Sequence, residues 1–337
     1  MKKKLGLKWI PWVLSIAFLI FLLNRLTEYD QLKSAFVKGD WWWMAVAVGC
    51  QILFYVLLSK VYQISFEIVG MKRTSISLFP VVLAAVFVNT ATPSAGLAGT
   101  ALYVKDAQKR GFTAVRGIAG FSIETVIQQI GFLFVSIVIV SGLYIFNGSV
   151  GTTELMIVGL VAGIIVVQII VLIASFFLPH LLEHVLSVVS RMSNWVIKKF
   201  RKKNLVSNEW PRNSAAEMKD IVGYVWSGRR MWFRAFFFSV VLQLSMNGTL
   251  YALIFAFRQG FNIEAGFGAY VVNNVAGAVL LGPQGVGVVE IGLALVVTHY
   301  GVVKGAAALI AIVFRALNFW LPMLAGFICF RKLRLFE

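Results

Sequence analysis

Hydrophobic positions along the chain gather into eight long segments separated by short polar connections. Six of these segments are continuous and near the ~20 residues that a helix needs to cross the ~30 Å hydrocarbon layer of a membrane. They cover residues 7–23, 41–59, 114–146, 153–178, 231–256 and 304–329. The pattern predicts an all-α polytopic membrane protein with about six full spans.

The other two segments, residues 76–111 and 265–300, are each broken near the middle by poor helix formers. The breaks read NTATPSAGLAG at 89–99 and GPQGVG at 282–287. In the first segment the arms, 76–88 and 99–104, are too short to span the membrane, which favours a re-entrant helical hairpin. In the second segment the arms have 17–18 residues. Either two thin spans or a re-entrant hairpin therefore fits, and the analogy with the first segment favours the hairpin.

Lysine and arginine set the expected orientation, because cytoplasmic loops of membrane proteins carry an excess of them. The basic N-terminus MKKK, the basic loop 179–230 and the C-terminal RKLR at 331–334 are expected inside, whereas the uncharged turn 147–152 is expected outside. These assignments place both ends of 76–111 on the inside and both ends of 265–300 on the outside. Two hairpins that enter from opposite faces are typical of an inverted repeat with a substrate site near the midplane.

Composition supports a single membrane domain over residues 1–337. The chain is 59% hydrophobic and 13% charged, with a mean hydropathy of +0.84, which lies outside the soluble globular range. The first apolar run continues to residue 23 without a small-residue cleavage site, so we read it as a retained span of a multi-pass protein in the cell membrane, with both termini cytoplasmic.

The net charge of +17 does not indicate a nucleic-acid partner. Ten of the 31 Lys and Arg residues lie in the loop 179–230, where they fit the topology rule and the attraction of anionic lipid head groups. The three histidines are scattered, and neither a metal site nor a cofactor is expected. A second copy of the chain or a synthase stays open as a protein partner.

Charged residues within the apolar segments are the first candidates for function, because each is costly to insert into a membrane. Arg315 is the cation placed firmly inside a segment, and Glu290 and Glu124 are its candidate partners. One interpretation is a buried ion pair that fixes helix packing. The other is that Arg315 contacts an anionic substrate such as a lipid phosphate, since its planar fork of donors suits phosphate, while a glutamate couples to protons or holds the empty site.

Further candidates come from the two breaks and from one neighbouring helix. Backbone N–H groups at half-helix ends attract anions through the helix dipole, whereas amides in membrane helices often join helices to one another. Together with Arg315, Glu290 and Glu124, the expected substrate-binding set contains Asn89, Thr92, Ser94, Gly96, Gly99, Asn273, Gln284, Gly285 and Gly287.

Three runs in matching order resemble the flippase-like integral membrane family, which is the transmembrane region of lysylphosphatidylglycerol synthases (the UPF0104 type). The runs are TPSAGLAGTALYVKDAQKRG at 92–111, GPQGVGVVE at 282–290 and FRALNFWLPMLAG at 314–326. The family elements fall on Asn89, Pro93, Gly96 and Gly99, then on Gly285, Gly287 and Glu290, and then on Arg315, Pro322 and Gly326.

Departures from the family pattern bear on the substrate. Where many relatives have Gly-Glu and a following Arg, this chain has Gly99 and Thr100, and the later Glu-Arg-x-x-Asp signature keeps only Glu124. The sequence also contains no soluble aminoacyl-transferase domain. The resemblance therefore implies movement of a phospholipid or lipid-linked substrate between leaflets rather than lipid aminoacylation, so that no catalytic residue is expected. The alternatives are a membrane scaffold for a lipid or cell-envelope synthase, and an intramembrane enzyme acting on lipid-linked intermediates.

Overall fold

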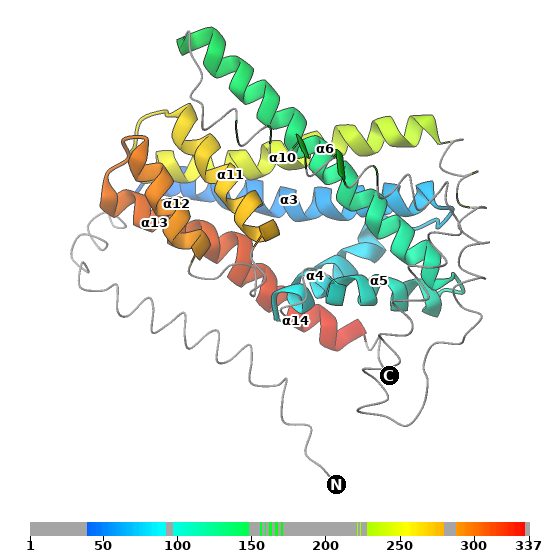
Figure 1. Cartoon of the computed structure of the whole chain (residues 1–337). Helices are drawn as coiled ribbons and strands as arrows, with labels where there is room; N and C mark the ends of the chain where they lie inside the picture. The colour runs from blue at the N-terminus through cyan, green and yellow to red at the C-terminus, as the bar shows by residue number, and fades with distance from the viewer. Residues whose placement is uncertain are drawn as a thin grey trace, which may run out of the picture.

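The computed structural model describes residues 39–91, 97–147, 228–279 and 288–333, together with isolated positions between 156 and 223. Within these ranges the chain is helical and contains no strand. Figure 1 shows an elongated bundle in which α3 and α10 run side by side. The helices are α3 (Trp41–Ile68), α4 (Ser75–Ala91), α5 (Leu97–Lys109), α6 (Ala114–Asn147), α10 (Arg229–Ala256), α11 (Ile263–Val279), α12 (Val288–His299), α13 (Lys304–Arg315), the π-helix η2 (Ala316–Trp320) and α14 (Leu321–Leu333).

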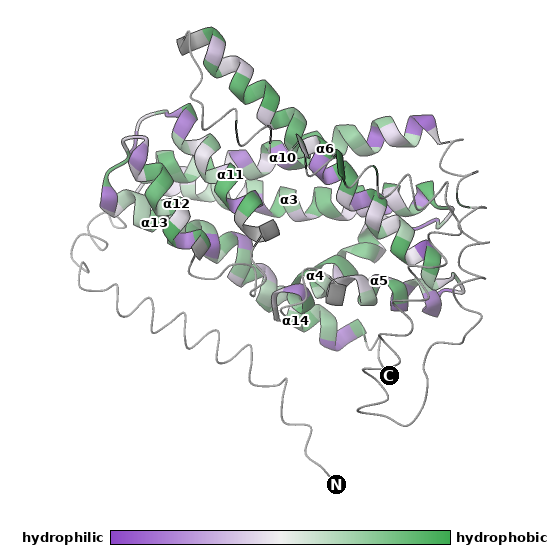
Figure 2. Cartoon of the chain, viewed as in Figure 1, coloured by the Kyte–Doolittle hydropathy of each residue, from purple (hydrophilic) through white to green (hydrophobic). Residues whose placement is uncertain are grey.

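Within the part of the chain that the structure describes, four helices are long and apolar enough to cross a membrane. They are Trp41–Ile68, Ala114–Ile145, Arg229–Ala256 and the continuous run Lys304–Leu333. These agree with four of the six predicted spans, and the predicted spans 7–23 and 153–178 fall outside the continuously described ranges. Figure 2 shows hydrophobic residues along these helices and hydrophilic residues concentrated near helix ends. The chain is therefore an all-helical membrane protein.

The long helices α3 and α10 form the antiparallel centre of the bundle. The Asp40 side chain caps α3 by accepting a hydrogen bond from the Trp42 N–H, at 2.9 Å, as N-cap residues do. The Asp40 N–H donates to the carbonyl of Ala256, at the last residue of α10, at 2.7 Å. The start of α3 is thus fixed to the end of α10, and the two helices run in opposite directions.

Each of the predicted hairpins is a pair of short helices that begins and ends at one end of this central pair. The ends of α4–α5 are joined by the ion pair of Arg73, just before α4, with Asp106 of α5. The ends of α11–α12 are joined by the Asn262 side chain, which donates to the carbonyl of Tyr300 at 2.6 Å. Because α3 and α10 are antiparallel, the hairpins that follow them start at opposite ends of the bundle, as Figure 1 shows.

The first hairpin differs from its predicted bounds. Its return arm, predicted over 99–104, is the 13-residue helix α5, and α4 continues to Ala91. The break is therefore narrower than the predicted 89–99. The helix continues past Val104 because Lys105, Asp106, Gln108 and Lys109 are good or tolerated helix residues, and Arg110 pairs with Asp106 one turn away.

Helix lengths repeat between two parts of the chain, which we call the first unit (residues 41–147) and the second unit (residues 229–333). The long helices α3 and α10 each have 28 residues, the following helices α4 and α11 each have 17, and α5 and α12 have 13 and 12. Each unit then ends in a further long helical run, α6 or α13–η2–α14.

Turn geometry repeats as well. Gly70 follows α3 with a φ of 81°, and Arg258, 188 positions later, follows α10 with a φ of 57°. At both turns the next N–H donates to a carbonyl five residues back, at 2.8 and 3.1 Å, which is the hydrogen bond of a Schellman motif. After α5 and α12, Gly111 and Gly301 have φ values of 80° and 91°. The units thus share helix lengths and turns while running in opposite directions.

The two largest hydrophobic cores among the described residues divide the bundle along its length. One contains the first part of α3, the end of α10 and the helices α11, α12 and α13. The other contains the end of α3, the start of α6 and of α10, and the first hairpin. The last helical run joins them: α13 belongs to the first core, whereas α14 packs on α4 so closely that a Cβ on Gly326 would lie 2.2 Å from the carbonyl oxygen of Leu83.

Candidate functional site

A buried ion pair joins the second hairpin to the last helical run. The Nε of Arg315, at the end of α13, donates to Oε1 of Glu290, in the first turn of α12, at 2.9 Å. The side chains are only 3% and 4% exposed. Glu290 is well placed for a carboxylate because the free N–H groups of a helix start favour negative charge. The guanidinium carbon of Arg315 also lies 4.3 Å from the centre of the Phe319 ring.

The pair lies deep within the bundle. Arg315 is eleven residues after Lys304, where α13 begins, and Glu290 is nine residues before His299, where α12 ends. At 1.5 Å per residue these separations correspond to about 17 and 14 Å. These distances are about half the ~30 Å thickness of a hydrocarbon layer. Of the two predicted partners for Arg315, the structure selects Glu290.

The helix changes its hydrogen-bonding pattern directly after Arg315. In the π-helix η2 the Leu321 N–H donates to the carbonyl of Ala316, five residues back. The α-helical donor to the Asn318 carbonyl would be the N–H of Pro322, which proline lacks. The Tyr55 hydroxyl of α3 donates to this carbonyl instead, at 2.9 Å. Single-turn π-helices are frequent at functional sites.

Side-chain amides extend the site across the interface of the two units. Asn318 accepts a hydrogen bond from Gln51 of α3 at 3.1 Å and donates to Asn273 of α11 at 3.3 Å. The Thr249 hydroxyl of α10 donates to the Gln51 oxygen at 3.4 Å. Asn273 was predicted for this region, but Asn318 and Gln51 were not. The available signal was Pro322, because a proline four residues after Asn318 leaves its carbonyl free to accept from another helix.

Asn89 closes the tip of the first hairpin. Its Oδ1 accepts from the N–H of Gly99, in the first turn of α5, at 2.6 Å. A Cβ on Gly99 would lie 2.4 Å from the amide nitrogen of Asn89. The two predicted residues are thus brought together for a physical reason: Asn89 caps α5 from the neighbouring helix, and only glycine leaves room for its amide.

Glu124 lies in a different place, on α6 against the end of α3. Its carboxylate accepts hydrogen bonds from Gln128, one turn along the same helix, and from Tyr62. Gln128 is joined to α10 through its carbonyl, which accepts from Gln243 at 3.1 Å. The prediction that Glu124 and Gln128 share a face is confirmed, and the alternative prediction that Glu124 pairs with Arg315 is replaced by these neutral partners.

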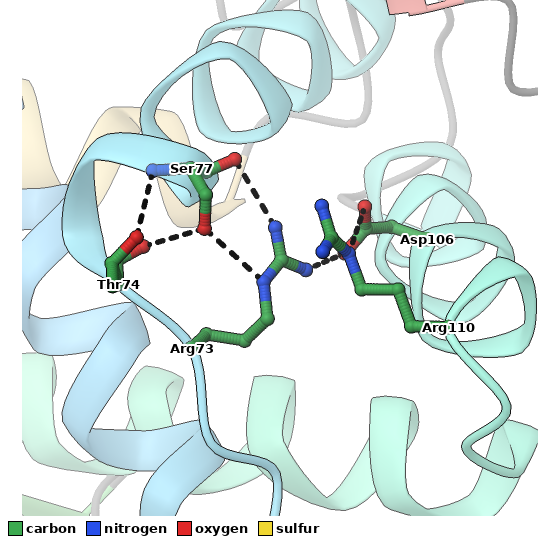
Figure 3. Close-up of polar contacts among 5 residues, drawn as sticks. All are labelled: Arg73, Thr74, Ser77, Asp106 and Arg110. Atoms are coloured by element: carbon green, nitrogen blue, oxygen red, sulfur yellow. Dashed lines mark hydrogen bonds and ion pairs between the residues drawn. The ribbon is translucent and has the colours of Figure 1, made fainter.

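A further charged cluster was missed by the sequence reasoning (Figure 3). Arg73, in the connection between α3 and α4, pairs with Asp106 of α5 and also contacts the Ser77 hydroxyl and carbonyl at 3.3 and 3.1 Å. Burial lowers the pKa of the Arg73 guanidinium, and the Asp106 carboxylate opposes this change. Arg73 and Arg110 had been counted only for topology, and Asp106 had not been considered. The spacing of Asp106 and Arg110, four apart on one helix, was the signal for a local pair.

Six predicted site residues lie outside the described ranges, in the two breaks. They are Thr92, Ser94, Gly96, Gln284, Gly285 and Gly287. Among the residues that the structure describes, no group of three or more His, Cys, Asp and Glu side chains could hold a metal ion. The roles of Arg315, Glu290 and Glu124 in substrate binding stay predictions.

The comparisons with known proteins agree with the membrane character of the fold. No curated protein matches the chain. The model of one family, described as the lysylphosphatidylglycerol synthase TM region, matches residues 9–326. Because this match covers most of the 337 residues, the chain belongs to the lysylphosphatidylglycerol synthase TM-region family.

Proposed function

We propose that the protein moves a lipid with an anionic or modified head group between the two leaflets of the cell membrane. The observation that carries the proposal is the buried Arg315–Glu290 pair deep in the bundle. A guanidinium inside a membrane protein is costly and functional by default, and its fork of donors fits the oxygens of a phosphate. Glu290 would hold Arg315 in the empty site, and a lipid phosphate would replace it.

The architecture supports such a transporter. Two short-helix hairpins that start at opposite ends of the bundle, with matched lengths and turns in the two units, suit an inverted repeat with a site between its halves. We propose that both hairpins are re-entrant. The end of the bundle with Lys72, Lys105, Lys109, Arg229 and Lys332 would be cytoplasmic.

Leaflet exchange in liposomes tests the function. The full chain is reconstituted with phospholipids that carry a fluorescent acyl chain, and the fraction exposed to a membrane-impermeant quencher is followed over time. We expect Arg315→Lys to slow exchange at least tenfold, because it keeps the charge but loses the two-donor fork. We expect Glu290→Gln to bind the anionic lipid more tightly and to release it more slowly.

A surface variant supplies the control. Lys304→Ala removes an exposed charge at the start of α13 and is expected to exchange lipid at the wild-type rate. Size-exclusion profiles identify any variant that does not fold. Exchange equal to that of empty liposomes for anionic, zwitterionic and cationic phospholipids would contradict the proposal.

A further inference from the structure

Glu124 is a second carboxylate deep in the bundle, and its surroundings differ from those of Glu290. The residue is 1% exposed. Its hydrogen-bond partners among the described residues are the Gln128 amide and the Tyr62 hydroxyl, and neither carries a positive charge. It lies ten residues after the start of α6, about 15 Å into the bundle.

Two of the helices packed around Glu124, α3 and α5, each place a tyrosine near it. Tyr62 of α3 and Tyr103 of α5 stack with their ring centres 4.6 Å apart, and both interact electrostatically with Glu124. The charged residues that follow Tyr103 on α5 are Lys105, which is exposed, and Asp106, which is paired with Arg73 and Arg110.

The third neighbour of α6 at this level is α10, which presents uncharged groups. Ser239 donates to the carbonyl of Ile127 at 3.0 Å, and Gln243 donates to the carbonyl of Gln128 at 3.1 Å. Neither side chain titrates. Among the described residues, the donors to the Glu124 carboxylate are therefore one hydroxyl and one amide. No guanidinium or ammonium group is recorded as a donor to it.

An ionised carboxylate without a countercharge is very costly in an apolar interior, and a group in this situation becomes neutral instead. Glu290 avoids the cost through Arg315. We propose that Glu124 is a proton-binding site: it holds a proton taken from water while α3, α5 and α6 are packed as described here, and releases it to water when these helices separate.

Proton binding at Glu124 would regulate movement of the first hairpin. With the proton bound, the carboxyl group can remain in its dry contact with Tyr62; without it, the charge favours entry of water between α5 and α6. Lipid exchange should then slow as the pH falls. This coupling, unlike the proton site itself, rests on the function proposed above.

Infrared difference spectroscopy tests the site without reference to transport. Spectra of the full chain in liposomes are recorded near neutral pH, where exposed carboxyl groups are ionised. We expect the C=O stretch of a protonated carboxyl group in the wild type, its loss in Glu124→Gln, and its retention in Glu290→Gln, the matched control. A wild type without this band, or a band that persists in Glu124→Gln, would overturn the proposal.

The pH profile of leaflet exchange tests the coupling. We expect wild-type exchange to slow as pH falls through a single transition, Glu124→Gln to be slow at every pH, and Glu290→Gln to keep a pH-dependent profile at a lower rate. A flat wild-type profile with the infrared band present would overturn the coupling and leave the proton site standing. No exchange in any protein would instead count against the proposed function, and the infrared result would still decide the site.

Discussion

The two units have the same helical frame but use their charged residues differently. In the second unit the buried charges, Arg315 and Glu290, meet at the tip of the hairpin. In the first unit Arg73 and Asp106 meet where the hairpin joins the rest of the bundle, and its tip is closed by Asn89, a neutral amide. The ends of the second hairpin are joined in turn by neutral groups, Asn262 and a backbone carbonyl.

This difference separates a feature that both hairpins share, a connection between their ends, from a feature of the second hairpin alone, the buried charge pair. Both hairpins need a connection between their ends, and the structure meets that need once with ions and once with an amide. A charge pair deep in the bundle is not required by the frame, because the first unit forms the same helix lengths and turns with Asn89 at its tip. The Arg315–Glu290 pair is thus what the second unit has beyond the shared frame, and under the proposed function it serves recognition.

The largest effect is expected from replacing one member of the Arg315–Glu290 pair. Arg315→Leu leaves a buried carboxylate without its partner, which costs about 3–5 kcal/mol. The double variant Arg315→Leu with Glu290→Leu should recover most of that stability, because apolar replacement of both members of a buried pair is often neutral. Thermal unfolding in lipid nanodiscs measures the stability of each variant.

Transport distinguishes the two interpretations of the pair. If it recognises lipid, the stable double variant exchanges lipid no faster than empty liposomes. An exchange rate within twofold of wild type in the double variant would mean that the pair only supports helix packing. The charge pair of the second unit would then have a structural role, like that of the first unit.

A smaller loss is expected at the base of the first hairpin. Asp106→Asn removes the charge that neutralises the buried Arg73 guanidinium but keeps a group that accepts one hydrogen bond. We expect about 2–3 kcal/mol of destabilisation, below the cost of deleting a partner outright, with the α4 and α5 amides exchanging hydrogen faster. Arg110→Ala is the control, because this side chain is 46% exposed and such pairs contribute less than about 1 kcal/mol. Equal losses in both variants would contradict the assignment.

The sequence predicts much of the frame because membrane physics constrains it strongly. Apolar length alone located the four spans that the structure describes. The expectation that both ends of each hairpin lie together agrees with the Arg73–Asp106 and Asn262–Tyr300 contacts, and re-entrance itself stays a prediction. Hairpin bounds were less predictable. Gly99, counted as part of the break, is helical because Asn89 supplies its N–H with a partner from another helix, and a single sequence does not reveal such a contact.

The candidate site was predicted in part for the same reason. A lone buried cation must have a partner, so the short list for Arg315 contained Glu290. Asn318 and Gln51 carry no such requirement, because amides occur at many helix contacts. Asp106 was missed because charges near a loop fit the topology rule without any partner. The family resemblance seen in the three motifs is confirmed by the match over residues 9–326.

The tip of the first hairpin should respond more weakly than its base. Gly99→Ala places a Cβ 2.4 Å from the Asn89 amide, so the cap must move and an N–H in the first turn of α5 loses its acceptor. We expect about 1–2 kcal/mol of destabilisation. Asn89→Ala should cost a similar amount, and the double variant no more than either alone, since both remove the same hydrogen bond. Additive losses of stability in thermal unfolding would show that Asn89 and Gly99 do not act through the same hydrogen bond.

The smallest changes in stability should come from substitutions at the equivalent turns after α3 and α10. Both positions have a positive φ, but Gly70 adopts it freely whereas Arg258 does not. Gly70→Ala should destabilise the protein by about 1 kcal/mol, and Arg258→Gly should stabilise it by up to about 1 kcal/mol, because a side chain is strained in the left-handed region. Arg258 is exposed, so the loss of its charge should have little further effect.

Thermal unfolding of the two single variants measures the sign of each change in stability. Arg258→Ala is the control, because it removes the charge but keeps a Cβ and therefore the backbone strain. Opposite signs for Gly70→Ala and Arg258→Gly would show that the equivalent turns bear the same backbone strain in spite of their different residues. A destabilising Arg258→Gly would mean that the two units, matched in helix length, do not share the energetics of their turns.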